Sequence, residues 1–305
     1  MYIADMHCDS LSCVSEECGL VNLYNTSKAH PQLQFFAYFS EKKNDPPSMR
    51  RKRLMHYYNI YLAECERLGL LNVVSGRDLF SAEETSKNAG MFTIEGGGGL
   101  FADSPELDIL ARGGLRVLGM AWDTNELSAG AFEKDDVGLT DEGRKMVARC
   151  AELGIIIDTS HLSDRAFYEV FDESPFPHIA THSNFREICS SKRNLTRDMA
   201  RRIASRGGVI GINLYPQFLN DNATAEIDDV IRHIDYALEL FGCDQNIGFG
   251  FDIDGTSGRY PQGLDEKSSI HDRVLERLTA RYGDKTTERI AGLNVLDFLK
   301  QNMIL

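Results

Sequence analysis

The segment from Gly154 to His161 reads GIIIDTSH, with three consecutive isoleucines followed by four polar residues. A short, continuous apolar run is typical of a strand buried on both faces, as strands of parallel sheets are. Helices are predicted on either side of it, over 141–153 and 162–171, with Ser163 as the N-cap of the second. A buried strand between two helices constrains the chain to an α/β architecture, because helices must cover both faces of the sheet.

The same alternation extends along the whole chain. Eight segments have the composition of strands: 1–6, 33–39, 91–95, 115–122, 154–159, 178–182, 208–214 and 247–252. The predicted helices are 49–68, 105–112, 141–153, 162–171, 196–206, 223–241 and helices within 266–305. The segments 10–31, 41–48 and 123–139 are predicted to be loops or connections. Eight such units in 305 residues, of which 42% are hydrophobic, fit a single (β/α)8 TIM barrel domain over 1–305.

Composition excludes several classes of partner. The net charge of −13 would repel a polyanion such as a nucleic acid. The seven cysteines are odd in number and include no Cys-x-x-Cys pair, so a disulfide framework or zinc finger is disfavoured and a reducing compartment is favoured. We recognise no signal peptide and no apolar run of the ~18 residues that a membrane span needs. We therefore expect a soluble, cytoplasmic protein with no membrane partner.

Residues of the types that bind metals end five of the predicted strands. They are His7, Asp9, Glu95, His161, His182 and Asp252. His7 and Asp9 share a face, because alternate side chains of a strand point the same way. In a barrel the carboxyl ends of all strands meet at one mouth. Imidazoles and carboxylates are ligands for zinc and similar ions, and the side chain of Glu95 is long enough to bridge two of them.

Each of these residues also has an ordinary explanation. A lone histidine at a strand end is commonly hydrogen-bonded or on the surface, and a strand-terminal aspartate commonly caps a helix or turn. Cys8 should face away from His7 and Asp9 as a packing residue. The glycines 96–99 allow a tight turn, and no Gly-Lys-Ser/Thr follows them to indicate a phosphate loop. Because three of only eight histidines fall at strand ends, a metal centre is favoured.

Seven short motifs occur in order along nearly the whole chain. They are Asp5-Met6-His7-Cys8-Asp9, Thr93-Ile94-Glu95-Gly96-Gly97, Asp158-Thr159-Ser160-His161, Thr181-His182-Ser183, Lys192-Arg193-Asn194, Gly250-Phe251-Asp252-Ile253-Asp254-Gly255 and Gly292-Leu293-Asn294. Together they resemble the motifs of the membrane (renal) dipeptidase family, peptidase family M19, within the amidohydrolase superfamily. That resemblance implies a (β/α)8 barrel with two zinc ions, or another divalent metal.

The resemblance also implies roles for individual residues. Five would be ligands: His7 and Asp9 on one ion, His161 and His182 on the other, and Glu95 between the two. Asp252 matches the acid that handles the proton of the attacking water. Arg193 matches the arginine that pairs with the terminal carboxylate of a dipeptide, to which a planar guanidinium is suited. Tyr215 matches a substrate-facing tyrosine, although wall packing is an equal alternative.

The chain departs from this family at Trp122, the only tryptophan. The family usually has a histidine there, which assists substrate binding. An indole donates one hydrogen bond and accepts none, so it cannot replace an imidazole in every role. We expect Trp122 to form a wall of the substrate pocket, with packing beneath the loop 123–139 as the alternative.

These observations predict a dinuclear zinc dipeptidase of the membrane dipeptidase type, with Asp252 as the base. Asp254 is the alternative base, because strand alternation would place it on the same face. Another amidohydrolase activity, on N-acyl amino acids or lactams, is the nearest rival. A non-catalytic ligand-binding barrel is disfavoured, because such a protein would have lost at least one ligand. The dipeptide's side chains and D or L configuration, the native metal and a homodimer stay open.

Overall fold

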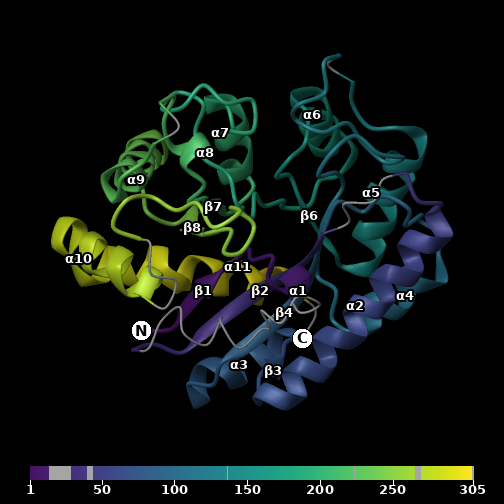
Figure 1. The fold of residues 1–305 in the computed structure, drawn as a ribbon, viewed down its shortest axis with the longest axis horizontal. Coiled ribbons are helices and arrows are strands. Elements are labelled where there is room, and N and C mark those ends of the chain that lie inside the picture. The colour runs from purple at the N-terminus through teal and green to yellow at the C-terminus, as the bar shows by residue number, and fades with distance from the viewer. Residues whose placement is uncertain (14–28, 40–43, 136, 223, 265–268, 304–305) are drawn as a thin grey trace.

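The computed structural model describes residues 1–13, 29–39, 44–135, 137–222, 224–264 and 269–303. One path of hydrogen-bonded neighbours runs through seven strands, in the order β6 (Ile156–Asp158), β5 (Val117–Gly119), β4 (Ala89–Glu95), β2 (Gln32–Phe39), β1 (Ile3–Asp5), β8 (Ile247–Phe249) and β7 (Ile210–Ile212). The pairs along this path are parallel, and β3 (Leu71–Asn72) adds to β4 beside it. Figure 1 shows β1, β2 and β4 in the middle of the molecule with helices around them.

The two ends of the path, β6 and β7, are linked through the segment predicted as the sixth strand. This segment makes single parallel bridges, from Ile179 to Asp158 and from Ala180 to Ile210. The α/β class with parallel strands is confirmed, but the named strands form an open, curled sheet and not the closed eight-stranded barrel that we predicted. The segment does not continue as a strand, because the N–H groups of Thr181 and His182 donate to side chains, not to a neighbouring backbone.

Several strands are shorter than predicted. The segments 115–122, 154–159, 208–214 and 247–252 pair over three residues each. Beyond those residues the backbone turns to other partners: the N–H of Phe251, for example, donates to the carboxylate of Asp5 at 3.1 Å. The early end of pairing frees these segments to carry polar side chains into the site.

Four elements were not predicted: β3, α1 (Ser10–Cys13), α3 (Gly76–Thr85) and α8 (Pro216–Leu219). Helix α1 begins inside the segment predicted as a loop, most of which lies outside the described residues. Helix α3 begins with a capping box between Ser75 and Asp78, so its Ser-x-x-Asp start was readable in the sequence.

The other helices lie close to their predicted positions. They are α2 (Pro47–Leu68), α4 (Pro105–Arg112), α5 (Asp141–Leu153), α6 (Asp164–Glu173), α7 (Arg197–Ser205), α9 (Ile227–Phe241), α10 (Ile270–Glu288), the π-helix η4 (Arg289–Leu293) and α11 (Asn294–Asn302). Helices α5, α6 and α7 begin after Thr140, Ser163 and Thr196, whose side chains accept a hydrogen bond from the first turn.

The core forms two buried clusters, because successive strand residues point to opposite faces. Phe36 and Phe92 pack outward against Tyr61 of α2, with ring centroids 5.8 and 5.5 Å away. Their neighbours Phe35 and Met91 belong to the other cluster, together with residues of α3 and α11. Both faces of the sheet are thus buried, as the continuous apolar runs predicted.

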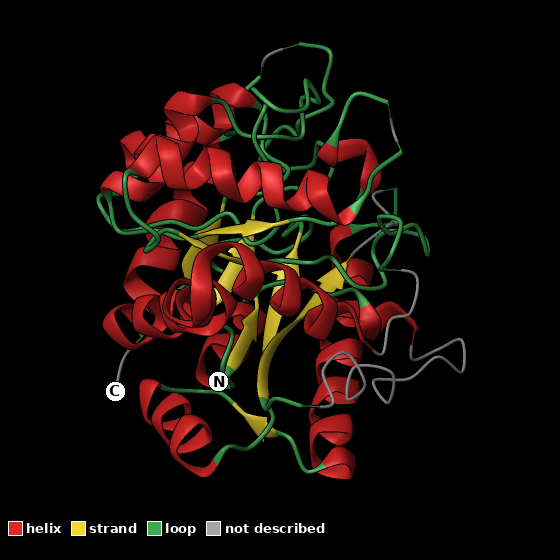
Figure 2. Ribbon diagram, turned by 90° about the vertical axis from the view of Figure 1, so that its left-hand side faces the viewer, coloured by secondary structure: helices red, strands yellow, loops and turns green. Residues whose placement is uncertain are grey.

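Figure 2 shows the strands enclosed by helices, with long loops gathered at one end of the sheet and the N-terminus near the other. Within the described ranges, none of the helices combines the length and the apolar character that crossing a membrane would require.

Candidate metal centre

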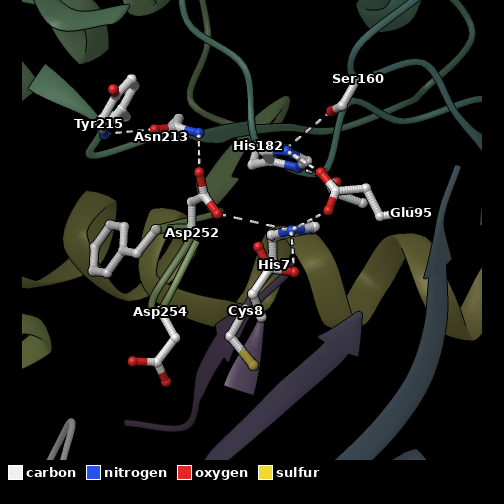
Figure 3. Close-up of polar contacts among 12 residues, drawn as sticks. His7, Cys8, Glu95, Ser160, His182, Asn213, Tyr215, Asp252 and Asp254 are labelled. Carbon is white, nitrogen blue, oxygen red and sulfur yellow. Dashed lines mark hydrogen bonds and ion pairs between the residues drawn. The ribbon is translucent and has the colours of Figure 1, made fainter. Parts of the chain in front are cut away.

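The residues predicted at the strand ends lie at the same end of the sheet. His7 and Asp9 follow β1, Glu95 ends β4, His161 follows β6, His182 follows the bridges at 179–180, and Asp252 follows β8. Figure 3 shows the side chains of His7, Glu95, His182 and Asp252 pointing toward one another. Residues separated by as many as 245 positions in the sequence therefore meet in one cluster.

The carboxylate of Glu95 lies between His7 on one side and the pair His161 and His182 on the other. Its Oε1 is 2.8 Å from Nε2 of His161 and 3.1 Å from Nε2 of His182. Its Oε2 faces the other way, 3.6 Å from Nε2 of His7. Glu95 is 4% exposed, so the carboxylate is held inside the protein. One oxygen directed at each side is the arrangement that a bridging carboxylate requires.

His7 lies at distances too long for hydrogen bonds and suitable for a shared ion. Its Nε2 is 3.7 Å from Oδ1 of Asp9 and 3.8 Å from Oδ1 of Asp252. Ligand atoms that bind one zinc ion at ~2.0–2.2 Å lie roughly 3–4 Å from each other. Within the described residues, Nε2 of His7 and Oε2 of Glu95 are buried without a hydrogen-bond partner. Such buried, unpaired polar atoms indicate a group that binds there, and the donor set suits a divalent metal.

The orientation of His182 is set by its neighbours. The hydroxyl of Thr181 donates to Asp158 at 2.5 Å, so it accepts from Nδ1 of His182, 2.7 Å away. This places the ring proton of His182 on Nδ1 and leaves the lone pair of Nε2 directed at Glu95. A lone pair facing a carboxylate oxygen is stable when a cation lies between them. Hydrogen bonding of the far ring nitrogen is also how proteins orient metal-binding histidines.

A second buried carboxylate, Asp5, supports the cluster from below. Its Oδ1 accepts the backbone N–H groups of His7 at 3.2 Å and of Phe251 at 3.1 Å. Its Oδ2 lies 2.9 Å from Nε2 of His271 in α10. Asp5 and His271 are 1% and 0% exposed. Asp5 therefore joins the segments that carry His7 and Asp252, and α10 holds Asp5 in place.

Asp252 and Asp254 have different surroundings. Asn213 donates from Nδ2 to Oδ2 of Asp252 at 3.0 Å, whereas Asp254 accepts a hydrogen bond from the hydroxyl of Ser10. Figure 3 shows Asp252 pointing into the cluster and Asp254 pointing away from it. Our expectation that both would share a face is wrong, because β8 ends at Phe249 and alternation does not extend to these residues.

Two site residues adopt backbone conformations that are uncommon outside glycine. His161 has φ 68° and Asp252 has φ 58°. The carbonyl of His161 accepts the N–H of Ala131 at 2.7 Å, which fixes this turn. A Cβ at Gly255 would collide with the carboxylates of Asp252 and Asp9, so the absence of a side chain there leaves room for both. Strain of this kind concentrates at functional sites.

The protein environment sets the charge of these groups before any ion is added. Burial lowers the pKa of His161 to about 4, and the charge of Arg193 acts in the same direction. Burial would raise the pKa of Glu95, but His7 and His161 outweigh it and hold that pKa well below its usual value. Burial raises the pKa of Asp252 to about 7, and the charge of His7 opposes the rise. A neutral His161 and an ionised Glu95 are the forms that bind metal.

A cavity of about 460 Å³ opens over the cluster. It is lined by Asp9, Glu95, Trp122, Asp123, Phe132, His161, Tyr215, Gln217, Phe218, Asp252, Gly255 and Ser257. Its volume lies within the ~300–1,000 Å³ range of small-molecule sites. Polar groups line the part of the cavity near the cluster, and aromatic rings line much of the rest. A small molecule bound at the cluster would therefore contact the polar groups and the rings.

The three residues predicted to bind substrate differ in position. Trp122 and Tyr215 line the cavity. Arg193 is buried at 3% exposure and does not line it; its Nη1 donates to Oγ of Ser183 at 2.8 Å and its Nη2 to the carbonyl of His182 at 2.9 Å. In this structure Arg193 therefore supports the segment that carries His182.

Sequence reasoning assigned no role to Asn213, His271 or Phe132. Asn213 could have been found, because it is a polar residue directly after the apolar part of the predicted strand 208–214. His271 lies in the first turn of a helix far along the chain, and Phe132 lies in a loop. Nothing in their sequence context distinguishes those two from ordinary helix and loop residues.

A model of the membrane dipeptidase family, peptidase family M19, matches residues 3–303. An uncharacterised protein of Klebsiella pneumoniae, from the region 5′ of pqqA, is 29% identical over 74% of this chain and 87% of its own length. The dipeptidase tcpJ of Claviceps purpurea is 29% identical over 73% of this chain. The matched region covers 53% of the length of tcpJ. A metallopeptidase of Rhodobacter sphaeroides, solved with a phosphinate mimic of the dipeptide L-Ala-D-Ala, has a TM-score of 0.87, 23% identity and 99% coverage of both chains.

The match over nearly the whole chain settles its class: it belongs to the membrane dipeptidase family. Members of this family are metallopeptidases, and the His, Glu and Asp cluster described above suits a divalent metal. The chain is thus a metal-dependent dipeptidase of family M19, as the motifs indicated.

Proposed function

We propose that the protein hydrolyses dipeptides at a dinuclear metal centre, with zinc as the favoured ion. The observation that supports this proposal is the position of Glu95, whose Oε1 faces His161 and His182 and whose Oε2 faces His7. Glu95 would bridge the ions. The ligand pairs would be His7 with Asp9 on one side, and His161 with His182 on the other.

Bound divalent ions would act as Lewis acids toward the scissile carbonyl and lower the pKa of water at the site. Asp252 would take the proton of the attacking water and deliver it to the leaving amine. A nearby cation would lower the pKa of Asp252 from about 7, because positive charge favours the carboxylate, and Asn213 would keep the side chain oriented.

Arg193 would hold the terminal carboxylate of the substrate. Its Nε has no hydrogen-bond partner among the described residues, although the two Nη groups are engaged. Burial lowers the pKa of Arg193 to about 10, so the guanidinium keeps its charge at neutral pH. Its position beside Phe218, with Cζ 5.7 Å from the ring centroid, puts this charge next to the cavity wall. Tyr215 lines the same side of the cavity.

We also propose that the curled sheet functions as a TIM barrel in a single domain over 1–305. The single bridges of Ile179 and Ala180 would supply the eighth member between β6 and β7. A barrel would explain why the proposed ligands and base, from five separate segments, meet at one end of the sheet.

Two measurements test the proposed function. Elemental analysis of the purified protein should find about two divalent ions per chain, and removing them with a chelator should abolish hydrolysis until metal is restored. A substrate panel should then show that dipeptides are cleaved faster than N-acyl amino acids or lactams. Full dipeptidase activity without metal would refute the mechanism, and a preference for acylated amino acids would favour the rival amidohydrolase activity.

A further inference from the structure

Large aromatic side chains are exposed at the cavity over the metal cluster. Phe132 is 64% exposed and Trp122 is 45% exposed, and both line the cavity with Tyr215 and Phe218. Exposing rings of this size to water is unfavourable, and such residues grouped around a concave site commonly mark a surface that a ligand covers. The ligand's contact with these rings therefore bears on which substrate the enzyme prefers.

The four rings form two walls over different parts of the cluster. The ring of Trp122 packs near that of His161, with centroids 5.9 Å apart, and against that of Phe39, with centroids 4.7 Å apart. Phe132 also lines the cavity, and the N–H of its neighbour Ala131 donates to the carbonyl of His161 at 2.7 Å, so we group Phe132 with Trp122. We call Trp122 and Phe132 the His161 wall.

The second wall lies on the side of Asp252. The N–H of Tyr215 donates to Oδ1 of Asn213 at 2.5 Å, and Asn213 in turn binds Asp252. The rings of Tyr215 and Phe218 meet edge to face at 4.9 Å, and Arg193 lies beside Phe218. Arg193, the cation that would bind a carboxylate, thus lies beside a ring of this second wall.

This division orients a dipeptide. With its carboxylate toward Arg193 and its scissile carbonyl over Glu95, the C-terminal residue lies along the wall of Tyr215 and Phe218. The N-terminal residue then reaches the His161 wall. We propose that the enzyme prefers dipeptides whose N-terminal residue is large and apolar, best aromatic, because that side chain packs against Trp122 and Phe132. This inference rests on the proposed dipeptidase function.

A basic N-terminal side chain is the principal alternative. Asp123 also lines the cavity, and aromatic faces attract cations as well as apolar groups. The carboxylate of Asp123, however, accepts the N–H of Thr124 at 2.8 Å, so part of its capacity is used within the protein. An apolar substrate side chain that covers the exposed rings is stabilised without any charged partner. The rings therefore favour an apolar over a basic N-terminal side chain.

The test compares kcat/KM of the metal-loaded enzyme for Phe-Ala, Leu-Ala, Ala-Ala, Lys-Ala and the reversed Ala-Phe, each prepared with an L and a D C-terminal residue. A methylene in a hydrophobic pocket changes kcat/KM by ~10-fold or more. We expect Phe-Ala to exceed Ala-Ala by at least about 10-fold and to exceed Ala-Phe as well. In Phe132→Ala the ratio of Phe-Ala to Ala-Ala should fall toward one.

Phe176→Ala is the matched control, because Phe176 is also exposed, at 53%, but lines a different cavity. Its substrate ratio should equal that of the unmodified enzyme. Trp122 gives a second measurement as the only tryptophan: at equal concentration, free phenylalanine should change its fluorescence more than free alanine.

The outcomes separate this inference from the proposed function. Hydrolysis of all the dipeptides at similar efficiency, a preference for Lys-Ala or Ala-Phe, or a ratio unchanged in Phe132→Ala would overturn the apolar N-terminal preference and leave a dipeptidase. Failure to cleave any dipeptide, with metal bound, would instead refute the proposed function.

Discussion

The segment 178–182 carries a buried histidine at each end, and the two have opposite surroundings. His182, at the carboxyl end, is 1% exposed and contacts Thr181 through Nδ1 and Glu95 through Nε2. His178, at the amino end, is 2% exposed, and neither ring nitrogen has a hydrogen-bond partner among the described residues. Four positions apart, one imidazole belongs to a polar cluster and the other stands alone.

The cavities at the two ends of the sheet also differ. That at the carboxyl end holds carboxylates, whereas that beside His178 has a volume of about 100 Å³ and a mostly apolar lining that includes Ile155, Ile156 and Ile157. Burial lowers the pKa of both histidines, to about 4 for His178. Burial alone therefore does not indicate function; the partners of the buried nitrogen do.

We expect the largest loss of bound metal and turnover when Glu95, at the carboxyl end of the sheet, is replaced. Glu95→Gln keeps the shape of the side chain but removes the charge that faces His7, His161 and His182. Bound metal should fall below two ions per chain, and turnover should fall by more than the ~10²-fold typical of changes to groups behind the ligands. Elemental analysis and dipeptide kinetics measure both. His178→Gln is the control at the other end, with metal content and turnover unchanged; retention of both ions in Glu95→Gln would contradict the bridge.

Asp252→Asn should have the next largest effect. The change removes the proposed base while the amide can still contact Asn213, so metal content should stay near that of the unmodified enzyme. Loss of general acid–base catalysis typically costs ~10²–10⁴-fold in turnover. Asp254→Asn is the matched variant, because Asp254 points away from the cluster and binds Ser10. A larger loss in Asp254→Asn than in Asp252→Asn would show that the base is assigned wrongly.

The sequence predicted that these polar side chains would meet at one end of the sheet, but it did not predict the residues that support them. Glu95 and His161 follow apolar runs that mark strand ends, and a parallel sheet brings strand ends together. The positions of Asp252 and Asp254 were not predictable, because left-handed turns follow β8 and strand alternation no longer applies. The contact of His271 with Asp5 joins positions 266 apart in the sequence, so tertiary packing alone creates it.

A smaller effect is expected at His271, which would influence the cluster only through its contact with Asp5. His271→Leu would leave an oxygen of the buried Asp5 carboxylate without its donor, and Asp5 holds the backbone of His7 and Phe251. We expect metal affinity to fall by ~10–100-fold, as for other groups behind the ligands. His271→Gln, which keeps a side-chain donor, should restore part of that affinity. Equal metal binding in both variants, with only thermal stability lowered, would limit His271 to packing.

The smallest expected effect concerns His178, at the amino end of the segment 178–182. It is a change in how the stability of the protein depends on acid pH. The charged group that faces His178 is Arg206, which lowers the pKa of His178 further, and the ring of Phe171 packs edge to face against it at 5.0 Å. Because the folded-state pKa of about 4 lies below the unfolded value of 6.5, protons bind the unfolded chain more readily between these values. The stability that His178 contributes while neutral is present above pH 6.5 and is lost as the pH falls toward 4.

His178→Gln replaces the titrating imidazole with a neutral amide. The stability of this variant should therefore depend less on pH than that of the unmodified protein. The relevant quantity is the difference in the free energy of unfolding between the unmodified protein and the variant, measured by denaturant titration at several pH values. Between pH 7.5 and pH 4 the unmodified protein should lose up to about 3 kcal/mol relative to the variant, since each pKa unit corresponds to about 1.4 kcal/mol. The other histidines titrate in both proteins, so their contributions cancel in the difference. Parallel curves would mean that His178 has partners or water that the apolar cavity does not suggest, and the contrast with His182 would then lose its physical basis.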